Sequence, residues 1–568
     1  MKLILREYLA SLRERAELDV ILPNLLSEMG YTVFVWPQVG TMQCGVDIAA
    51  VSPASAGPRR VHLLSVKRGD LTRTEWSNDT PQALRPSLVE ILDGFIPHRI
   101  PKQYAHLPIV VCLCFGGEMA DNASALVHGF IQTHEREGLT FEIWNGDFIA
   151  NLLLDGILRE DIFPKTMRSD LRKAIALLDE PTIAYGHYAR LAGRLAEASA
   201  AGPAKAVTAA RQLYIAAWML YVWSRESGNL EAPYRASELG ILHLWEFLKP
   251  HLGGAGKYKN ALERVMVQMI NLHLTIAEAL LIQKIEPAAR KRDAVAAAVG
   301  SPTSVDINLA LFELVGRAAM TSLWMHWLGQ HPDWSEGRDF SAAKQRYYDL
   351  AINLIRSNGC LGSPIADQQT VDVGLVFLAG LTSEQSLDDL VAWISVMVDR
   401  LTYAFRSRSH YPSASDDYRD WLTLPGHGDE EGFKDATVGS SLIPLLAAWA
   451  SGLSLGPARA RLAKLVEEVL PLTTMQMLVA DEATEAHLYL NTDEHGWCLN
   501  DLPIVAEGTA LVETIQEACE SHESFKALSA WKTGFWPVIL LACRHWRRPI
   551  PPDFYADNLA PPRVPTAT

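Results

Sequence analysis

The sequence predicts an α/β N-terminal domain with a mixed central sheet, followed by a large all-α C-terminal domain. Up to about residue 160, short β-type runs alternate with helical segments, whereas nearly every later segment repeats apolar residues at three- and four-residue spacing. The length of 568 residues also exceeds what one hydrophobic core organises. We therefore expect domains at 1–165 and 166–546, with a further break near 300–306 or 358–367, and a proline-rich tail at 547–568 that runs extended over the surface or is disordered.

The N-terminal domain divides into short segments. A helix is expected at 3–29, and strands at 32–36, 46–51 and 61–66. A helical stretch at 81–95, a strand at 108–115, a helix at 121–137, a strand at 140–144 and a short helix follow. The run at 109–115 is apolar on both faces, which is typical of a central strand covered by helices. In the second part, 261–282 and 386–405 have the pattern of helices with one buried face.

Charge and composition exclude several classes of protein. With 51 Lys and Arg against 66 Asp and Glu, the net charge of −15 excludes binding of nucleic acid through bulk positive charge, so a basic surface must be local. The hydrophobic share of 49% excludes a disordered acidic chain. Seven scattered cysteines resemble reduced intracellular thiols, and no export signal is recognised, so we expect a cytoplasmic protein. The uncharged run Thr437–Ala458 holds too many Gly, Ser and Pro for a membrane span and predicts a buried helix ended by Gly452 and Gly456, with no membrane partner.

Chemistry is indicated where two expected strands end. If the runs at 46–51 and 61–66 pair, Asp47 at the start of one and Lys67 at the end of the next can project into one cleft, and Ser65 shares the face of Lys67. A carboxylate and an ammonium in this arrangement suit phosphodiester hydrolysis. Asp47 would bind Mg²⁺ or Mn²⁺, and Lys67 would position the attacking water or stabilise charge on the phosphate. The alternative is an ordinary salt bridge at the strand ends.

The order of elements around these residues resembles the restriction-endonuclease-like PD-(D/E)XK nuclease superfamily, and within it Mrr-type enzymes. The resemblance rests on the helix, Gly30-Tyr31, the Gly-x-Asp of a strand, the x-Val-Lys of the next strand, and the segment at 141–146 before a closing helix. It covers roughly residues 1–160, and the helical remainder is not recognised. It implies catalytic roles for Asp47 and Lys67, and metal assistance from an acid on the first helix, where this chain has Glu17 and Asp19.

One position departs from the pattern of that family. Ser65 stands where the family has Asp, Glu or Gln, and a hydroxyl is a poor metal ligand. Either another acid from the following segment reaches the metal, or the site is weakened or inactive. The acids available there are Glu75, Glu90 and Asp93.

Basic residues gather locally around the expected strand at 61–66. Arg59, Arg60, Arg68 and Arg73 join Lys67 in a short window with a single acid, Asp70, which favours contact with a polyanion. A solvated loop is the alternative, and it weighs equally for Arg59 and Arg60.

We therefore expect a metal-dependent endonuclease that acts on DNA, with RNA as the less favoured substrate, joined to a helical recognition or assembly domain. By analogy, such an arrangement fits a prokaryotic anti-phage defence effector. The alternative is a catalytically silent nuclease-like module that binds nucleic acid or protein on a helical scaffold. A third reading makes the helical domain the functional core, which binds a protein encoded in the same operon; homo-oligomers are also compatible with each reading.

Overall fold

The computed structural model describes residues 6, 9, 18–37, 43–54, 57–77, 83–155, 165–254, 256–331, 334, 339–423, 430–493, 495–521 and 523–559. The chain forms two compact units, Met1–Ala236 and Ser237–Thr568, so the division falls inside α11 (Glu231–Leu248). The expected change of domain type near residue 165 adjoins residues 156–164, which lie outside the described part. The boundary at 165, and the further breaks near 300–306 and 358–367, stay predictions.

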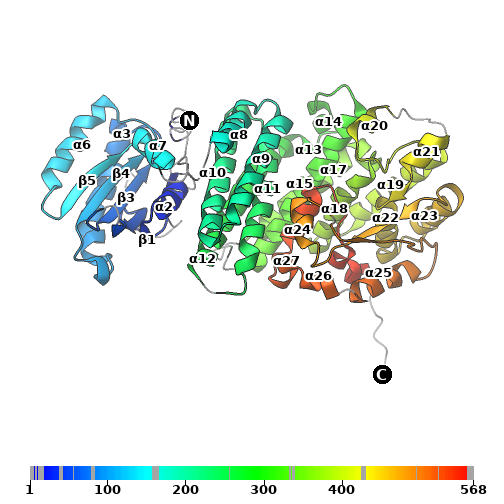
Figure 1. Ribbon diagram of the computed structural model, residues 1–568. Coiled ribbons are helices and arrows are strands. Elements are labelled where there is room, and N and C mark those ends of the chain that lie inside the picture. The colour runs from blue at the N-terminus through cyan, green and yellow to red at the C-terminus, as the bar shows by residue number, and fades with distance from the viewer. Residues whose placement is uncertain are drawn as a thin grey trace. The chain divides into compact units, whose positions relative to one another are not determined.

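The first unit contains a mixed five-stranded sheet, as the sequence predicts (Figure 1). Its strands are β1 (Thr32–Val35), β2 (Ile48–Val51), β3 (Val61–Lys67), β4 (Ile109–Phe115) and β5 (Leu139–Trp144), and their order in the sheet follows their order in the chain. The pairs β1/β2 and β2/β3 are antiparallel, whereas β3/β4 and β4/β5 are parallel. The carboxyl ends of β3, β4 and β5 therefore meet at one edge of the sheet.

Helices surround this sheet and continue beyond it. They are α2 (Asp19–Glu28), α3 (Arg73–Trp76), α4 (Leu84–Glu90), η3 (Ile91–Phe95), α5 (Ile96–His98), η4 (Lys102–Tyr104), α6 (Asp121–His134), α7 (Gly146–Asp155), α8 (Lys165–Ala176), α9 (Pro181–Ser199) and α10 (Pro203–Ser227). The helical stretch expected at 81–95 begins at Leu84 and changes to a π-helix at Ile91. The one-turn helix α3 was not expected.

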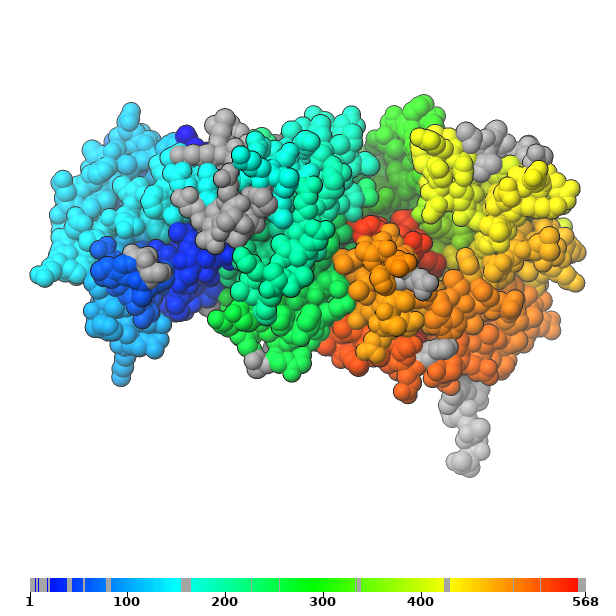
Figure 2. Space-filling model, in the orientation of Figure 1, coloured from blue at the N-terminus to red at the C-terminus, as the bar shows by residue number. Residues whose placement is uncertain are grey.

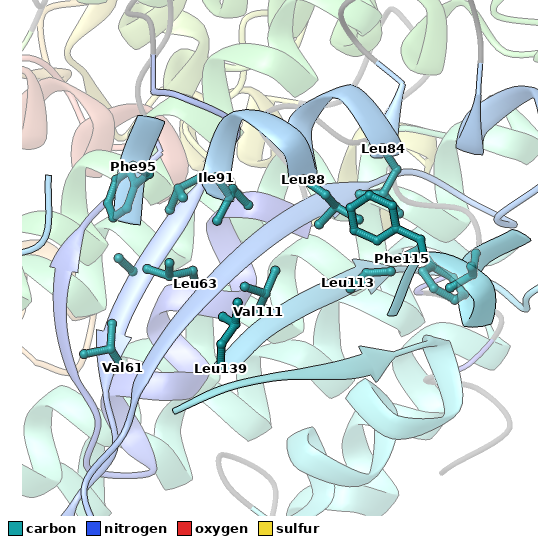
Figure 3. Packing of buried hydrophobic residues seen from close by; sticks show 14 of the residues in the cluster. Val61, Leu63, Leu84, Leu88, Ile91, Phe95, Val111, Leu113, Phe115 and Leu139 are labelled. Carbon is teal, nitrogen blue, oxygen red and sulfur yellow. The ribbon is translucent and has the colours of Figure 1, made fainter. Parts of the chain in front are cut away.

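One face of the sheet carries the hydrophobic core of this domain (Figure 3). The register pairs Leu63 with Ala49 and with Val111, so side chains at these positions share a face. Leu84, Leu88, Ile91 and Phe95 of α4 and η3 pack onto that face, together with residues of α3 and α6. Since side chains alternate along β3, Ser65 and Lys67 also belong to the face that α4 covers.

The second unit is mainly helical. Its long helices are α12 (Lys257–Ala277), continued by η6 (Glu278–Ile285), α15 (Ser304–Gln330), α17 (Ser341–Ser357), α18 (Thr370–Thr382), α19 (Asp388–Arg406), α22 (Leu442–Gly452), α23 (Gly456–Val469), α25 (Ala510–Ser521) and α28 (Pro537–His545). Shorter pieces are η5 (Lys249–His251), α13 (Glu286–Ala289), α14 (Ala294–Ala298), η7 (Gly359–Gly362), η8 (Asp367–Gln369), α20 (Tyr418–Thr423), α21 (Glu430–Ala436), α24 (Glu485–Leu490), α26 (Glu523–Ala527), α27 (Ser529–Lys532), η9 (Pro552–Phe554) and η10 (Ala556–Leu559).

Two expectations for this unit need correction. It is not all-α, because β6 (Gly439–Ser440) pairs with β7 (Thr474–Met475) and β8 (Met477–Val479) pairs with β9 (Trp497–Leu499). The tail is also not extended over the surface up to residue 559. Ile550, Tyr555 and Leu559 are buried, because apolar side chains between the prolines find core positions. In Figure 2 the red atoms of this C-terminal part form a small area among green, yellow and orange surfaces.

Among the described residues, one helical stretch, Lys257–Ala289, is long and apolar enough to cross a membrane. Two thirds of its most apolar window is buried inside the protein (67%), as in a core helix of a soluble protein. The run checked in the sequence, Thr437–Ala458, contains α22, which is almost wholly buried and ends at Gly452 as expected. Gly456 begins the next helix instead of ending this one.

A network of buried charges joins helices of the second unit. Glu238 of α11 is fully buried and accepts hydrogen bonds from Arg544 Nη2 and, at 2.9 Å, from His545 Nδ1, both on α28. Burial alone would raise the pKa of the Glu238 carboxyl, but Arg544 and His545 lower it below its usual value. Arg547 forms two further hydrogen bonds, 3.0 and 2.5 Å long, with the buried carboxylate of Asp372 on α18. These pairs fasten the C-terminal helix to the core of the unit.

We predict that Glu238→Gln lowers the free energy of unfolding by about 3 to 5 kcal/mol, because it removes the nearer carboxylate from the buried Arg544 guanidinium and leaves Glu313 at 3.6 Å to balance the charge. Urea unfolding of the whole protein, followed by circular dichroism, measures this loss. As a control, Glu286→Gln breaks the exposed pair with Arg346 and should lower the stability by at most about 1 kcal/mol. Equal losses in the two variants would contradict the prediction.

Two buried histidines predict acid sensitivity. Burial lowers the pKa of His243 to about 4, with a contribution from His545, and burial lowers that of His273 to about 4, with contributions from Arg544 and Arg317. Both are neutral when folded, whereas the unfolded chain takes up protons near pH 6.5, so stability falls as the pH drops from about 6.5 towards 4. In thermal melts at about pH 7.5 and about pH 5, the wild-type melting temperature should fall more than that of His273→Gln. A variant of the exposed His98, His98→Gln, should behave as wild type.

Candidate functional site

A tight turn places the start of β2. Gly45 has φ +73°, and a Cβ atom there would lie 2.0 Å from the carbonyl oxygen of Ser87 in α4. Only glycine allows both this backbone conformation and this approach. The first residue of the Gly-x-Asp motif thus lets the chain pass directly against α4 before it enters the sheet.

Asp47 lies directly before β2 and is bound to the neighbouring strand. Its backbone N–H donates to the Leu64 carbonyl (2.9 Å), and its Oδ2 accepts a hydrogen bond from the Val66 N–H (2.7 Å). The pairing of Ile48 with Leu64 sets Asp47 opposite Ser65. A carboxylate has about four acceptor positions, and the hydrogen bond from the Val66 N–H orients the group and occupies one of them.

Ser65 and Lys67 complete the arrangement expected from the sequence. Both side chains belong to the same face of β3, and both are buried, Ser65 fully and Lys67 with 5% of its surface exposed. Among the described residues, Ser65 Oγ has no hydrogen-bond partner. A buried hydroxyl without a partner is unusual, and it marks a position where a ligand atom or a water molecule would be stabilised.

Two of the other expected metal ligands have no described side chain, and the remaining three can be located. Glu17 lies outside the described residues, and Asp19 begins α2 without a described side chain. Glu90 and Asp93 are exposed on α4 and η3, and Glu75 is half-buried in α3. None of these three has a contact with Asp47 among the interactions that the structure describes.

Among the residues whose side chains are described, the donor set at this point is one carboxylate and one neutral hydroxyl. Within the described part of the chain, no group of three His, Cys, Asp or Glu side chains is placed to hold a metal ion. Mg²⁺ is commonly held by one or two carboxylates, with waters and substrate phosphates as the remaining ligands. Asp47 with Ser65 Oγ therefore fits a weak Mg²⁺ site that depends on the substrate, and does not fit a closed structural site.

The basic residues expected to gather around β3 lie in two places, one at each end of that strand. Arg68 and Arg73 follow Lys67 at the carboxyl end of β3 and are exposed. Arg59 and Arg60 are exposed before the amino end of the same strand. β3 lies between the two pairs, and its seven residues span about 20 Å from the first Cα to the last, in six steps of roughly 3.3 Å.

Sequence reasoning missed polar residues in the loops after β4 and β5. Glu118 accepts hydrogen bonds from Arg6 (2.7 Å) and from Asn145 Nδ2 (3.2 Å), and its N–H donates to Asp70 (2.8 Å). Arg6 also lies 3.7 Å from Asp147. These groups follow the same strand ends as Lys67. Polar residues directly after apolar parallel strands, here Gly117-Glu118 and Asn145-Gly146-Asp147, were the available signal.

The opposite face of the sheet holds a second group of titratable side chains. Burial lowers the pKa of His62, whose ring lies 5.3 Å from that of Tyr31, and Trp144 Nε1 donates to Glu142 (2.9 Å). Burial raises the pKa of Cys112 and Cys114 well above the usual thiol value. Both thiols are buried in the core and stay protonated at neutral pH.

Comparisons of the chain with protein-family models, with curated proteins and with solved structures give no match.

We predict that Gly45→Ala lowers the free energy of unfolding by at least about 2 kcal/mol, since an added Cβ meets the Ser87 carbonyl and the left-handed conformation is strained. Gly129→Ala in α6 is the matched control, because a Cβ there meets nothing within 4 Å. It should leave stability unchanged or raise it by up to about 1 kcal/mol. Thermal and urea unfolding measure both, and a stable Gly45→Ala would contradict the described turn.

Proposed function

We propose that the N-terminal α/β domain is a metal-dependent nuclease that hydrolyses phosphodiester bonds in DNA, with RNA as a less favoured substrate. The observation that carries this proposal is the meeting of Asp47, Ser65 and Lys67 on one face of two paired strands, at the edge where three parallel strands end. The resemblance of the motif order to PD-(D/E)XK nucleases of the Mrr type supports it.

In this proposal each side chain has a separate task. The Asp47 carboxylate, oriented by the Val66 N–H, and Ser65 Oγ hold a Mg²⁺ or Mn²⁺ ion. When bound, the ion supplies charge neutralisation and polarises the phosphate oxygens. The Lys67 ammonium, positioned by β3, donates hydrogen bonds to the attacking water or to the phosphate oxygens as negative charge develops. Burial of Lys67 strengthens that interaction, because less water screens it.

One observation favours a second candidate function. Ser65 offers no charge at the position of a metal-binding acid, and Asp47 already serves a structural purpose as the acceptor for the Val66 N–H. Such a domain could bind nucleic acid or protein without cleaving it. In that case the buried Lys67 would only balance the charge of the strand ends.

The helical remainder would then serve recognition or assembly, through a protein partner encoded nearby or through a second copy of the chain. We further propose a cytoplasmic location and, by analogy of domain arrangement alone, a role in prokaryotic anti-phage defence. The burial of the apolar stretch Lys257–Ala289 supports a soluble protein.

We predict that Asp47→Ala and Lys67→Ala each abolish cleavage of plasmid, linear and single-stranded DNA in Mg²⁺ or Mn²⁺. Loss of a group that stabilises transition-state charge lowers the rate by roughly 10²-fold or more. Gel assays with purified full-length protein measure this, and far-ultraviolet circular dichroism checks that both variants fold. Glu90→Gln, an exposed acid on the covering helix α4, is the matched control and should cleave as wild type.

Ser65→Asp tests the departure from the family pattern. A carboxylate there completes a metal site and should raise cleavage if the site is weakened. No cleavage by wild type or by Ser65→Asp, together with DNA binding that neither EDTA nor Asp47→Ala changes, would refute the nuclease and establish the silent module.

A further inference from the structure

Two loops at the amino end of the parallel strands combine an unusual composition with spatial proximity. Segment 52–60 leads into β3, and segment 96–108 leads into β4. Together they contain Arg59, Arg60, Arg99 and Lys102, two histidines and no Asp or Glu, although the protein has a net charge of −15. The two segments are therefore locally basic in a chain that is acidic as a whole.

The fold brings the two loops together. The Val61 N–H donates to the Pro108 carbonyl (2.9 Å), so the loops leave the sheet side by side. The Arg59 guanidinium lies over the ring of Tyr104, 5.9 Å from its centre, and this ring in turn lies 5.4 Å from that of Phe34. Because Arg59 belongs to the first loop and Tyr104 to the second, this contact joins the two loops.

These four cations have no acidic partners among the described residues. Arg59, Arg60, Arg99 and Lys102 are all exposed, and the structure describes no ion pair for any of them. Other arginines, such as Arg356 with Asp389 and Arg406 with Glu468, are paired at 2.6 Å. Arg59, Arg60, Arg99 and Lys102 therefore give these two loops a positive charge that no acid in the described part of the chain pairs with, and we call these four residues the loop surface.

We propose that the loop surface binds the phosphate backbone of double-stranded DNA, separately from the edge that holds Asp47 and Lys67. The proposal rests on the nuclease function proposed above for the choice of ligand, and it assigns binding and cleavage to opposite ends of β3. A duplex that contacts both ends must span about 20 Å, or roughly six base pairs at 3.4 Å each. Guanidinium and ammonium groups that contact only phosphate oxygens bind the DNA backbone without sequence specificity.

The test measures binding without cleavage. Full-length protein in EDTA is titrated against a fluorescent duplex of about 20 base pairs at salt concentrations from about 50 to 200 mM, and anisotropy gives the affinity. Wild type is compared with the triple variant Arg59→Gln, Arg60→Gln, Lys102→Gln. Because each lost phosphate contact reduces the slope of log K against log salt by about 0.9, we expect a slope smaller by about 2 to 3 and affinity at least about tenfold weaker.

A charge-matched control separates local contact from net charge. Arg290, Lys291 and Arg292 are exposed in the other unit and also comprise two arginines and one lysine. Their replacement by Gln should leave the affinity within about twofold of wild type. The slope of log K against log salt should change by no more than about 0.5. Equal losses of affinity in both triple variants would overturn the proposal, and so would unchanged DNA binding by the loop-surface variant. A larger loss of affinity for an RNA hairpin than for the DNA duplex in the loop-surface variant would also overturn it.

The outcome is independent of the nuclease proposal. Asp47→Ala should bind the duplex like wild type in EDTA, so the loop surface stands even if no cleavage is found. If cleavage is found but the loop-surface variant binds and cleaves like wild type, the loop surface is refuted and the nuclease remains.

Discussion

The candidate site depends on one constraint, the register in which β2 pairs with β3. The Val66 N–H binds the carboxylate of Asp47, and the Asp47 N–H binds the Leu64 carbonyl, so both backbone and side chain of the same residue hold the two strands in place. A slip of one residue would turn Asp47 and Ser65 to opposite faces of the sheet. Gly45 makes this register accessible, because only a residue without a side chain fits between the turn and α4. Gly45 and Asp47 thus fix the strand register in addition to any chemical role. Their spacing can be recognised in the sequence because the register depends on it.

The strands and most helices of the first domain could be predicted because their signals are local. Apolar runs bounded by turn residues indicate β3 to β5 to within one or two residues, and the alternation of side chains indicates that Ser65 and Lys67 share a face. The basic residues around β3 show that closeness in sequence does not predict closeness in space. Arg59 and Arg73 are close in sequence, yet a straight strand separates their loops by about 20 Å. The sequence therefore suggested one basic surface, whereas the extended strand β3 places these residues on two separate surfaces.

Interactions between segments that are distant along the chain could not be predicted from the sequence. Glu238 and Arg544 are separated by about three hundred residues, and each has the appearance of an ordinary surface charge within its own helix. Only the packing of α11 against α28 shows that both are buried and paired. The same holds for the loop surface, because Lys102 and Arg59 belong to different connections that meet only through the parallel pairing of β3 with β4. Long-range pairing, and not local preference, determines both the stability of the second unit and the distribution of charge on the first.

An acidic protein that acts on DNA must solve an electrostatic problem. A net charge of −15 repels a polyanion at long range, and the effect of any compensating group is limited to about one Debye length, roughly 8 Å at physiological salt. Cations that are paired with acids give little attraction beyond that distance, so only unpaired ones can hold a phosphate backbone. At the carboxyl edge Lys67 is buried and Arg6 pairs with Glu118 and Asp147, whereas Arg68 and Arg73 are exposed there. In our proposal the loop surface adds exposed cations, without an acidic partner among the described residues, at the other end of β3. A duplex bound in this way would be held partly at the reacting bond and partly several base pairs away from it.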